Sequence, residues 1–264
     1  MSEHVLIERR GHVMEITLNK PKVNAIDHEM SKVVADAFVA FDTDDDLRVA
    51  ILTASGDRIF SAGWDLKALD RGDAKLDEWW DDGDYGYGGF AGITENWTMN
   101  KPVIAALNGL VIGGGFEIAM ACDLMIAADH VEFALPEMPL GIIPDSGAIQ
   151  RLPRLIPHNI AMEMLLLGEF LPASRVAEIG LVNRVVPLSE LETASMDMAR
   201  IIANKSPSAV KIGKRAFYEQ VEMPLEEAYT FAGRTMAENM MAKDAEAGIG
   251  AFTRKEPMPD WTGE

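Results

Sequence analysis

The sequence contains a single cysteine, Cys122, among 264 residues. One cysteine forms no intrachain disulfide, which fits a reducing compartment, and its apolar neighbours predict an unreactive thiol in the core. No uninterrupted apolar run approaches the ~18 residues that a membrane span requires. The N-terminal segment carries Glu3 and lacks the apolar stretch of a secretory signal. We therefore expect a soluble, cytoplasmic protein without a membrane partner.

Basic residues are also scarce. The 24 lysines and arginines stand against 42 aspartates and glutamates, so the formal net charge is -18. Such a field repels nucleic acid, and no basic arm or stripe offsets it, so we expect no nucleic-acid partner. The five histidines show no His-x-x-x-His spacing, and the acidic segment 42–46 lacks the glycine and distal glutamate of a calcium loop. The sequence therefore predicts no metal site.

The sequence does contain an alternation of strand-like and helix-like segments. Strands alternate with helices as far as Pro187 and only helices follow, which predicts an α/β fold with a C-terminal helical region. Asp27 is suited to cap the first helix, because its side chain can accept a hydrogen bond from a free backbone N–H. The expected strands are 5–9, 12–18, 48–53, 102–107, 131–135 and 181–186, and the expected helices are 27–41, one ending at 155, 159–167, 172–179, 188–203, 207–220, 225–241 and 244–252.

The most informative stretch runs from Asn108 to Asp123, directly after the apolar strand 102–107. Three consecutive glycines, Gly113 to Gly115, precede a helix that carries Glu117 in its first turn. Glycine has no Cβ, so another molecule can approach the backbone closely, and the free N–H groups of a helix start can hold a negative charge. A dinucleotide-binding Gly-x-Gly-x-x-Gly pattern is not completed, because position 118 is isoleucine.

Other residues could act together with these glycines. The loop 61–66 offers a backbone N–H at Trp64 and the glycines offer another at Gly114, and two converging N–H donors form an oxyanion hole. Glu117 and Glu137 are carboxylates in apolar stretches, where mutual repulsion and poor solvation should raise at least one pKa. Two acid–base groups beside an oxyanion hole suit chemistry through an enolate, in which a proton moves at the carbon α to a carbonyl and water is added or lost at the next carbon.

Plainer interpretations of these residues remain open. Glu117 could simply favour the helix dipole, a contribution of ~0.3–1 kcal/mol, and Glu137 could be a surface turn residue that follows Pro136. Ser61 and Ser146 lack a Gly-x-Ser-x-Gly elbow, so the sequence does not support a serine hydrolase.

The same motifs carry a resemblance to a known family. Segments 60–67, 108–117, 122–123, 133–137 and 141–144 together resemble the enoyl-CoA hydratase/isomerase (crotonase) superfamily, in order and over nearly the whole chain. Within that superfamily, segments 62–67, 88–95, 144–147 and 183–186 are most similar to the carnitinyl-CoA dehydratase branch, which acts on crotonobetainyl-CoA.

The resemblance implies a fold and a set of roles. It implies a crotonase-like ββα spiral over residues 1–198 and a C-terminal helical region over 199–264 that builds trimers, often paired as hexamers. The N–H groups of Trp64 and Gly114 would hold the thioester oxygen as an enolate forms. Glu117 would activate or release water at the β-carbon, and Glu137 would exchange the proton at the α-carbon. Both acids are present, which favours an enoyl-CoA hydratase-type hydro-lyase over the nearest alternative, an enoyl-CoA isomerase of the same superfamily.

Coenzyme A would then be part of the substrate, and no separate cofactor is expected. Its anionic phosphates call for basic residues, although each lysine alone could be an ordinary surface charge. Lys20, Lys22 and Lys67 lie beside the matching segments, and Arg254 and Lys255 follow the last expected helix, where members of the family often reach the nucleotide bound to a neighbouring subunit. The expected substrate and coenzyme A contacts are Lys22, Ala25, Ala62, Trp64, Asp65, Leu66, Lys67, Gly113, Gly114 and Lys255.

The acyl end of the substrate is less defined. The position of Trp64 usually holds a small residue in plain enoyl-CoA hydratases, so a simple fatty-acyl substrate is in doubt. A trimethylammonium group suits aromatic faces and carboxylates, although the pair Trp79–Trp80 could instead anchor a loop onto the core. The candidate aromatic residues are Trp64, Trp79, Trp80, Tyr85, Tyr87 and Phe90, among Asp81, Asp82 and Asp84.

Overall fold

The computed structural model describes residues 3–71 and 85–264. Their strands form two sheets, and the chain passes repeatedly from the first sheet to the second, in the pairs β3–β4, β5–β6 and β7–β8. The six-stranded sheet has the order β1 (Val5–Arg10), β2 (Val13–Leu18), β3 (Val49–Ala54), β5 (Val103–Leu107), β7 (Leu124–Ala128) and β10 (Arg184–Val186). The four-stranded sheet has the order β4 (Ile59–Ser61), β6 (Leu110–Ile112), β8 (Glu132–Ala134) and β9 (Leu171–Pro172).

Most neighbouring strands are parallel, and only β1–β2 and β8–β9 pair antiparallel. Parallel sheets are covered on both faces, which explains why β5 reads as an unbroken apolar run and is buried along its whole length. Helix α7 (Leu191–Ala203) packs against β3, β5 and β7, and α1 (His28–Thr43) contacts β1 and β2. The N-cap of α1 is Asp27, whose carboxylate accepts a hydrogen bond from Met30 N at 2.9 Å, as predicted.

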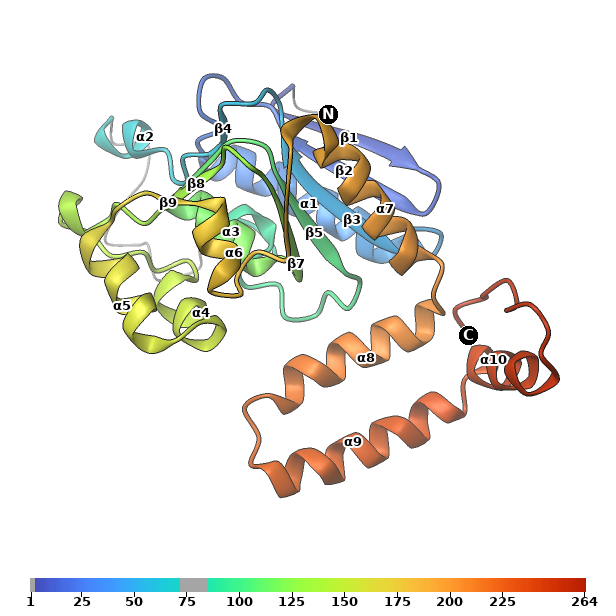
Figure 1. Cartoon of the computed structure of the whole chain (residues 1–264). Helices are drawn as coiled ribbons and strands as arrows, with labels where there is room; N and C mark the ends of the chain where they lie inside the picture. Colours follow the sequence, from blue (N-terminus) through green and yellow to red (C-terminus); the bar gives the residue numbers. More distant parts are fainter. Residues whose placement is uncertain (1–2, 72–84) are drawn as a thin grey trace.

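Among the remaining helices of this part, α3 and α6 pack against the second sheet, whereas η1 packs against α1 and η3 against α7. Helix α3 follows β6 directly, and α4 and α5 form a layer beside it (Figure 1). These elements are α2 (Leu66–Asp70), α3 (Gly114–Ala121), α4 (Ala148–Leu155), α5 (His158–Leu167) and α6 (Ala173–Glu178), with the short 3-10 helices η1 (Phe90–Gly92), η2 (Met138–Leu140) and η3 (Leu188–Glu190).

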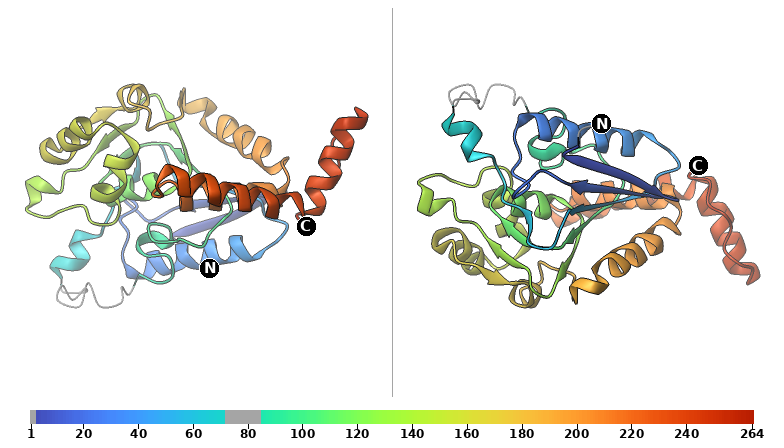
Figure 2. Two further views of the ribbon diagram at one scale, coloured as in Figure 1. Left: turned by 90° about the horizontal axis from the view of Figure 1, so that it is seen from below. Right: turned by 90° about the horizontal axis from the view of Figure 1, so that it is seen from above.

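The last three helices lie outside the sheets: Figure 1 shows α8 and α9 below them, and in both figures α10 projects from one end of the molecule (Figures 1 and 2). They are α8 (Pro207–Gln220), α9 (Leu225–Met240) and α10 (Lys243–Arg254). Asp123, just before β7, holds α8 to the sheets, because it pairs with Lys214 Nζ at 2.7 Å and accepts a hydrogen bond from Tyr218 Oη at 2.9 Å. Residue 198, the expected domain boundary, falls inside α7.

The sequence analysis missed the shortest elements. It did not predict β4, β6, β7, β9 or α2, which are two to five residues long and too short to show a period. Within residues 3–71 and 85–264, no helix is long and apolar enough to cross a membrane.

Candidate active site

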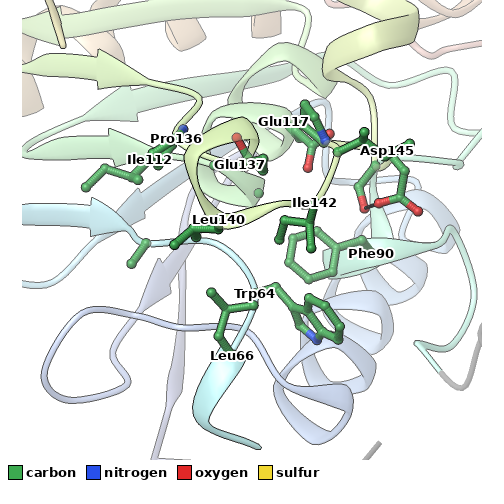
Figure 3. A pocket seen from close by; sticks show the side chains of 16 residues that line it. Trp64, Leu66, Phe90, Ile112, Glu117, Pro136, Glu137, Leu140, Ile142 and Asp145 are labelled. Carbon is green, nitrogen blue, oxygen red and sulfur yellow. Dashed lines mark hydrogen bonds between the residues drawn. The ribbon is translucent and has the colours of Figure 1, made fainter. Parts of the chain in front are cut away.

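A cleft opens where the parallel strands of the second sheet end. Ala62 follows β4, Gly113 follows β6 and Glu137 lies shortly after β8. The residues that follow three neighbouring strands therefore line the same cleft. The cleft encloses about 560 Å³ of empty space, including its open mouth. Figure 3 shows its lining, which consists of Ala62, Trp64, Leu66, Phe90, Ile112, Gly113, Gly114, Glu117, Pro136, Glu137, Leu140, Ile142, Ile143, Pro144, Asp145 and Ser146.

Two backbone segments cross in close contact at the floor of the cleft. One is the segment 61–64, and the other is the start of α3. A Cβ on Gly63 would lie 2.4 Å from Gly114 N, and a Cβ on Gly115 would lie 2.3 Å from Ser61 O. No side chain fits at either position, so both glycines are required for this contact. The Ser61 hydroxyl accepts a hydrogen bond from Gly63 N at 3.0 Å and donates one to Asn24 O at 2.8 Å, which fixes the segment. We call this contact the glycine crossing.

The glycine crossing brings together the two backbone N–H groups predicted to form an oxyanion hole. Gly114 is the first residue of α3, so its N–H has no acceptor within the helix. Trp64 forms a parallel bridge with Ile26, in which Ile26 N donates to Gly63 O at 2.8 Å and Asp65 N donates to Ile26 O at 3.0 Å. In such a bridge the N–H of Trp64 points to the side opposite Ile26. Both residues line the cleft.

Glu117 enters the cleft from the first turn of α3. Its side chain is buried, and Oε1 accepts a hydrogen bond from Ala148 N at 2.9 Å, at the start of α4. The pKa of Glu117 is raised to about 8, and burial is the largest cause. The Ala148 N–H lowers the pKa, and the negative charges of Glu137 and Asp145 make smaller contributions that raise it.

Glu137 faces the same cleft from the turn after β8 (Figure 3). Its Oε1 occupies the space above Gly113, where a Cβ would lie 2.6 Å away. Its Oε2 is buried, and no hydrogen-bond partner for it exists within the described parts of the chain. Burial raises the pKa of Glu137 to about 7. The sequence analysis expected a raised pKa from repulsion between the two glutamates as well as from poor solvation, but burial is the larger cause for both.

The structure separates the expected contact residues into two groups. Ala62, Trp64, Leu66, Gly113 and Gly114 line the cleft. The other five, Lys22, Ala25, Asp65, Lys67 and Lys255, do not line it.

The residues outside the cleft have other surroundings. Asp65 caps α2 by accepting from Ala68 N at 3.1 Å, and it pairs with Lys20 at 3.2 Å. Lys20 also pairs with Asp27, so its ammonium group is held between two carboxylates. Lys255 directly follows α10, which lies at the opposite end of the molecule from α4 and α5 (Figure 1).

Aromatic side chains lie on one wall of the cleft. The Phe90 ring rests on Gly114, where a Cβ would lie 2.8 Å from Phe90 Cε1, and Tyr85 packs edge-on against Phe90 with 5.5 Å between ring centroids. Tyr87 is exposed, and its hydroxyl contacts Thr98. Trp79, Trp80, Asp81, Asp82 and Asp84 lie outside the described residues.

The segment 140–146 also lines the cleft, although the sequence analysis gave it no role. Asp145 and Ser146 belong to a quoted motif, 144–147, which was the only sequence signal for them. Cys122 is buried and its pKa is raised by burial, which agrees with the expected inert thiol. Among residues 3–71 and 85–264, no group of three histidine, cysteine, aspartate or glutamate side chains could hold a metal ion.

The fold and the cleft define an α/β protein in which two buried glutamates share one cleft with Trp64 and Gly114. Comparison with known proteins gives a family with this kind of fold. A sequence profile described as "Enoyl-CoA hydratase/isomerase" matches residues 8–264. The chain is 43% identical over 267 residues to the carnitinyl-CoA dehydratase of Salmonella typhi, with 100% of both chains covered.

Solved structures give the same result. The crystal structure of an enoyl-CoA hydratase from Mycobacterium tuberculosis H37Rv matches with a TM-score of 0.90 and 36% identity, covering 100% of both chains. An enoyl-CoA hydratase from Geobacillus kaustophilus HTA426 matches with a TM-score of 0.90 and 31% identity, covering 100% of this chain and 98% of the other. The chain belongs to the enoyl-CoA hydratase/isomerase family, the crotonase superfamily, and has its mixed α/β fold.

Proposed function

We propose that this protein is a hydro-lyase that reversibly adds water to a 2-enoyl-CoA thioester. The observation that carries the proposal is the convergence of Glu117, Glu137 and the N–H groups of Trp64 and Gly114 on one cleft. Full-length similarity to a carnitinyl-CoA dehydratase and to enoyl-CoA hydratases supports the same reaction class.

The geometry supports a sequence of proton transfers. The thioester oxygen accepts hydrogen bonds from Trp64 N–H and Gly114 N–H, which stabilise negative charge on it as the enolate forms. The Glu117 carboxylate takes a proton from water, and the oxygen of that water bonds to the β-carbon. The Glu137 carboxyl group then gives its proton to the α-carbon, and the carbonyl is restored. Dehydration follows the same steps in reverse.

The raised pKa values suit these roles. Values of about 8 for Glu117 and about 7 for Glu137 let either group hold or release a proton near neutral pH. A general acid or base works best when its pKa lies near the working pH, and such a group contributes typically about 100- to 10,000-fold in rate.

For the acyl group we propose the crotonobetainyl/carnitinyl pair. The support is the similarity to carnitinyl-CoA dehydratase and the large aromatic surface of Trp64 and Phe90 in the cleft. For coenzyme A we keep Lys22, Lys67 and Lys255 as candidate phosphate contacts, with Lys255 acting on the substrate of a neighbouring subunit. The C-terminal helices would form a trimer, or a hexamer of two trimers.

The reaction type is tested with heavy-oxygen water. After incubation with crotonobetainyl-CoA and, in parallel, with crotonyl-CoA, mass spectrometry of the products should find one heavy oxygen at the β-carbon. A product of unchanged mass with a moved double bond would show an isomerase, and would contradict the proposal.

A further inference from the structure

The cleft contains a third acidic side chain, which the hydration steps leave unused. Asp145 lines the cleft together with Glu117 and Glu137, whereas none of the 16 described lining residues is a lysine, an arginine or a histidine. A negatively charged Asp145 would not strengthen the binding of a neutral acyl chain. The carboxylate of Asp145, with no basic side chain among the described lining residues, instead favours a ligand that brings its own positive charge.

Asp145 lies on the same side of the cleft as the aromatic ring of Phe90. Figure 3 shows Phe90 between Trp64 and Asp145, on the side of the cleft away from Glu137. Burial is the main cause of the raised pKa of Glu117 and of Tyr85, the residue that packs against Phe90, and the negative charge of Asp145 adds to both shifts. An aromatic wall and an anionic side chain therefore face the same space.

This combination fits a quaternary ammonium group. Such a group has no N–H to donate, so it is held by ring faces and by negative charge rather than by directed hydrogen bonds. A neutral branched chain of the same shape would lie beside the Asp145 carboxylate and remove some of its water without compensation.

We propose that Asp145, with the rings of Phe90 and Trp64, forms a subsite for a cationic acyl tail and sets the preference of the enzyme for that tail over a neutral one. This inference rests on the proposed function and assigns the recognition of its substrate to a residue. Asp145 is here a specificity residue, and the proton transfers stay with Glu117 and Glu137.

Binding of two unreactive thioesters separates recognition from turnover. One is the saturated γ-trimethylammonio-butanoyl-CoA, and the other is its neutral isostere, in which a tert-butyl group replaces the trimethylammonium group. Titration calorimetry on the full-length protein gives the ratio of the two dissociation constants. We expect the wild type to bind the cationic thioester about 10-fold more tightly, and Asp145→Asn to reduce this ratio to about 2-fold.

Two further variants serve as controls. Asp145→Glu retains the charge and should keep most of the preference. Asp129→Asn makes the same chemical change at an exposed turn after β7, outside the cleft, and should leave the ratio unchanged. Circular dichroism melting of each variant shows whether the fold is intact.

The outcomes are distinct. Equal affinity of the wild type for both thioesters, or a ratio that Asp145→Asn leaves unchanged, would overturn the assignment of Asp145. A preference that depends on Asp145 in a protein that incorporates no heavy oxygen would support the subsite and contradict the hydro-lyase proposal instead.

Discussion

Neither glutamate of the cleft is well compensated as an anion. Glu117 accepts a backbone hydrogen bond from Ala148, and Oε2 of Glu137 has no partner within the described residues, while both side chains are buried. Desolvation therefore exceeds stabilisation, and both pKa values lie above the ordinary glutamate value of 4.5. The raised pKa values follow from burial with few stabilising hydrogen bonds.

This shift predicts a pH dependence of stability. Between about pH 4.5 and pH 8 the folded chain holds protons on Glu117 and Glu137 that the unfolded chain has released, so the free energy of unfolding falls as the pH rises through this window. Glu117→Gln removes one of these groups. Relative to the wild type, its free energy of unfolding should rise by about 2–4 kcal/mol between about pH 5 and pH 9, as measured by urea denaturation.

The control for this pH dependence is Glu163→Gln, an exposed glutamate on α5. Its difference from the wild type should stay constant, within about 0.5 kcal/mol, at every pH. A constant difference for Glu117→Gln as well would contradict the raised pKa of Glu117.

At the scale of elements, the site depends on the glycine crossing. It joins the loop after β4 to the start of α3 with no side chain between them, so Trp64 and Gly114 line the same cleft. The precision of the site comes from two backbones in contact, each continuous with a strand of the second sheet.

Gly63→Ala should therefore affect catalysis as well as stability. Gly63 has φ 78°, and an added Cβ would lie 2.4 Å from Gly114 N, so the two segments must separate. Displacement of a catalytic group by about 1 Å can lower the rate about 100-fold, and we expect a loss of that size in kcat, measured with crotonobetainyl-CoA.

Gly11→Ala is the matched control. Gly11 has φ 66° in the turn between β1 and β2, but a Cβ there would meet nothing within 4 Å. This variant should lose about 1 kcal/mol of stability through its backbone conformation alone and keep the kcat of the wild type. If Gly63→Ala also kept the kcat of the wild type, the result would contradict the claim that catalysis depends on the glycine crossing.

The sequence allowed much of this element-level structure to be predicted. Helix α1 with its Asp27 cap and helix α8 at 207–220 were found, because long amphipathic segments and caps leave clear local patterns. The helix start at Gly113–Gly115 was found from its three consecutive glycines. In contrast, β4 and β6 were missed, because each is only three residues long and lies next to glycine-containing loop sequence, whereas the equally short β8 lies within the longer alternating segment 131–135.

Long-range contacts were the harder part. The sequence placed Lys20 near the matching loops, but its pairing with Asp27 and Asp65 depends on three segments meeting in space. The position of Asp145 in the cleft depends likewise on how 140–146 folds over α3, and no local pattern encodes that arrangement. The roles of the individual site residues stay predictions until the variants are measured.

At the scale of the molecule, the three C-terminal helices expose an unusual amount of apolar surface. Leu225 and Tyr229 on α9 are each 75% exposed, and Phe252 on α10 is 74% exposed. Helices that project from a globular core with such side chains are typical of a subunit interface. Asp123, through Lys214 and Tyr218, fixes the direction in which α8 leaves the core.

Leu225→Glu should weaken the proposed assembly. A charge placed in an apolar interface loses its water on association, so sedimentation velocity should show a shift from trimer or hexamer towards monomer. Glu226→Gln, in the first turn of the same helix, is the control and should leave the sedimentation profile unchanged. A wild-type protein that sediments as a monomer would contradict the interface itself.

The central claim is that two carboxyl groups in one cleft add the elements of water to an enoyl thioester. The most direct measurement is the steady-state hydration rate of crotonobetainyl-CoA by the wild type, Glu117→Gln and Glu137→Gln, each checked for intact folding. We predict that kcat falls at least about 100-fold in both variants, because each loses a different proton transfer. Rates within about threefold of the wild type in both variants would contradict the two-carboxylate mechanism.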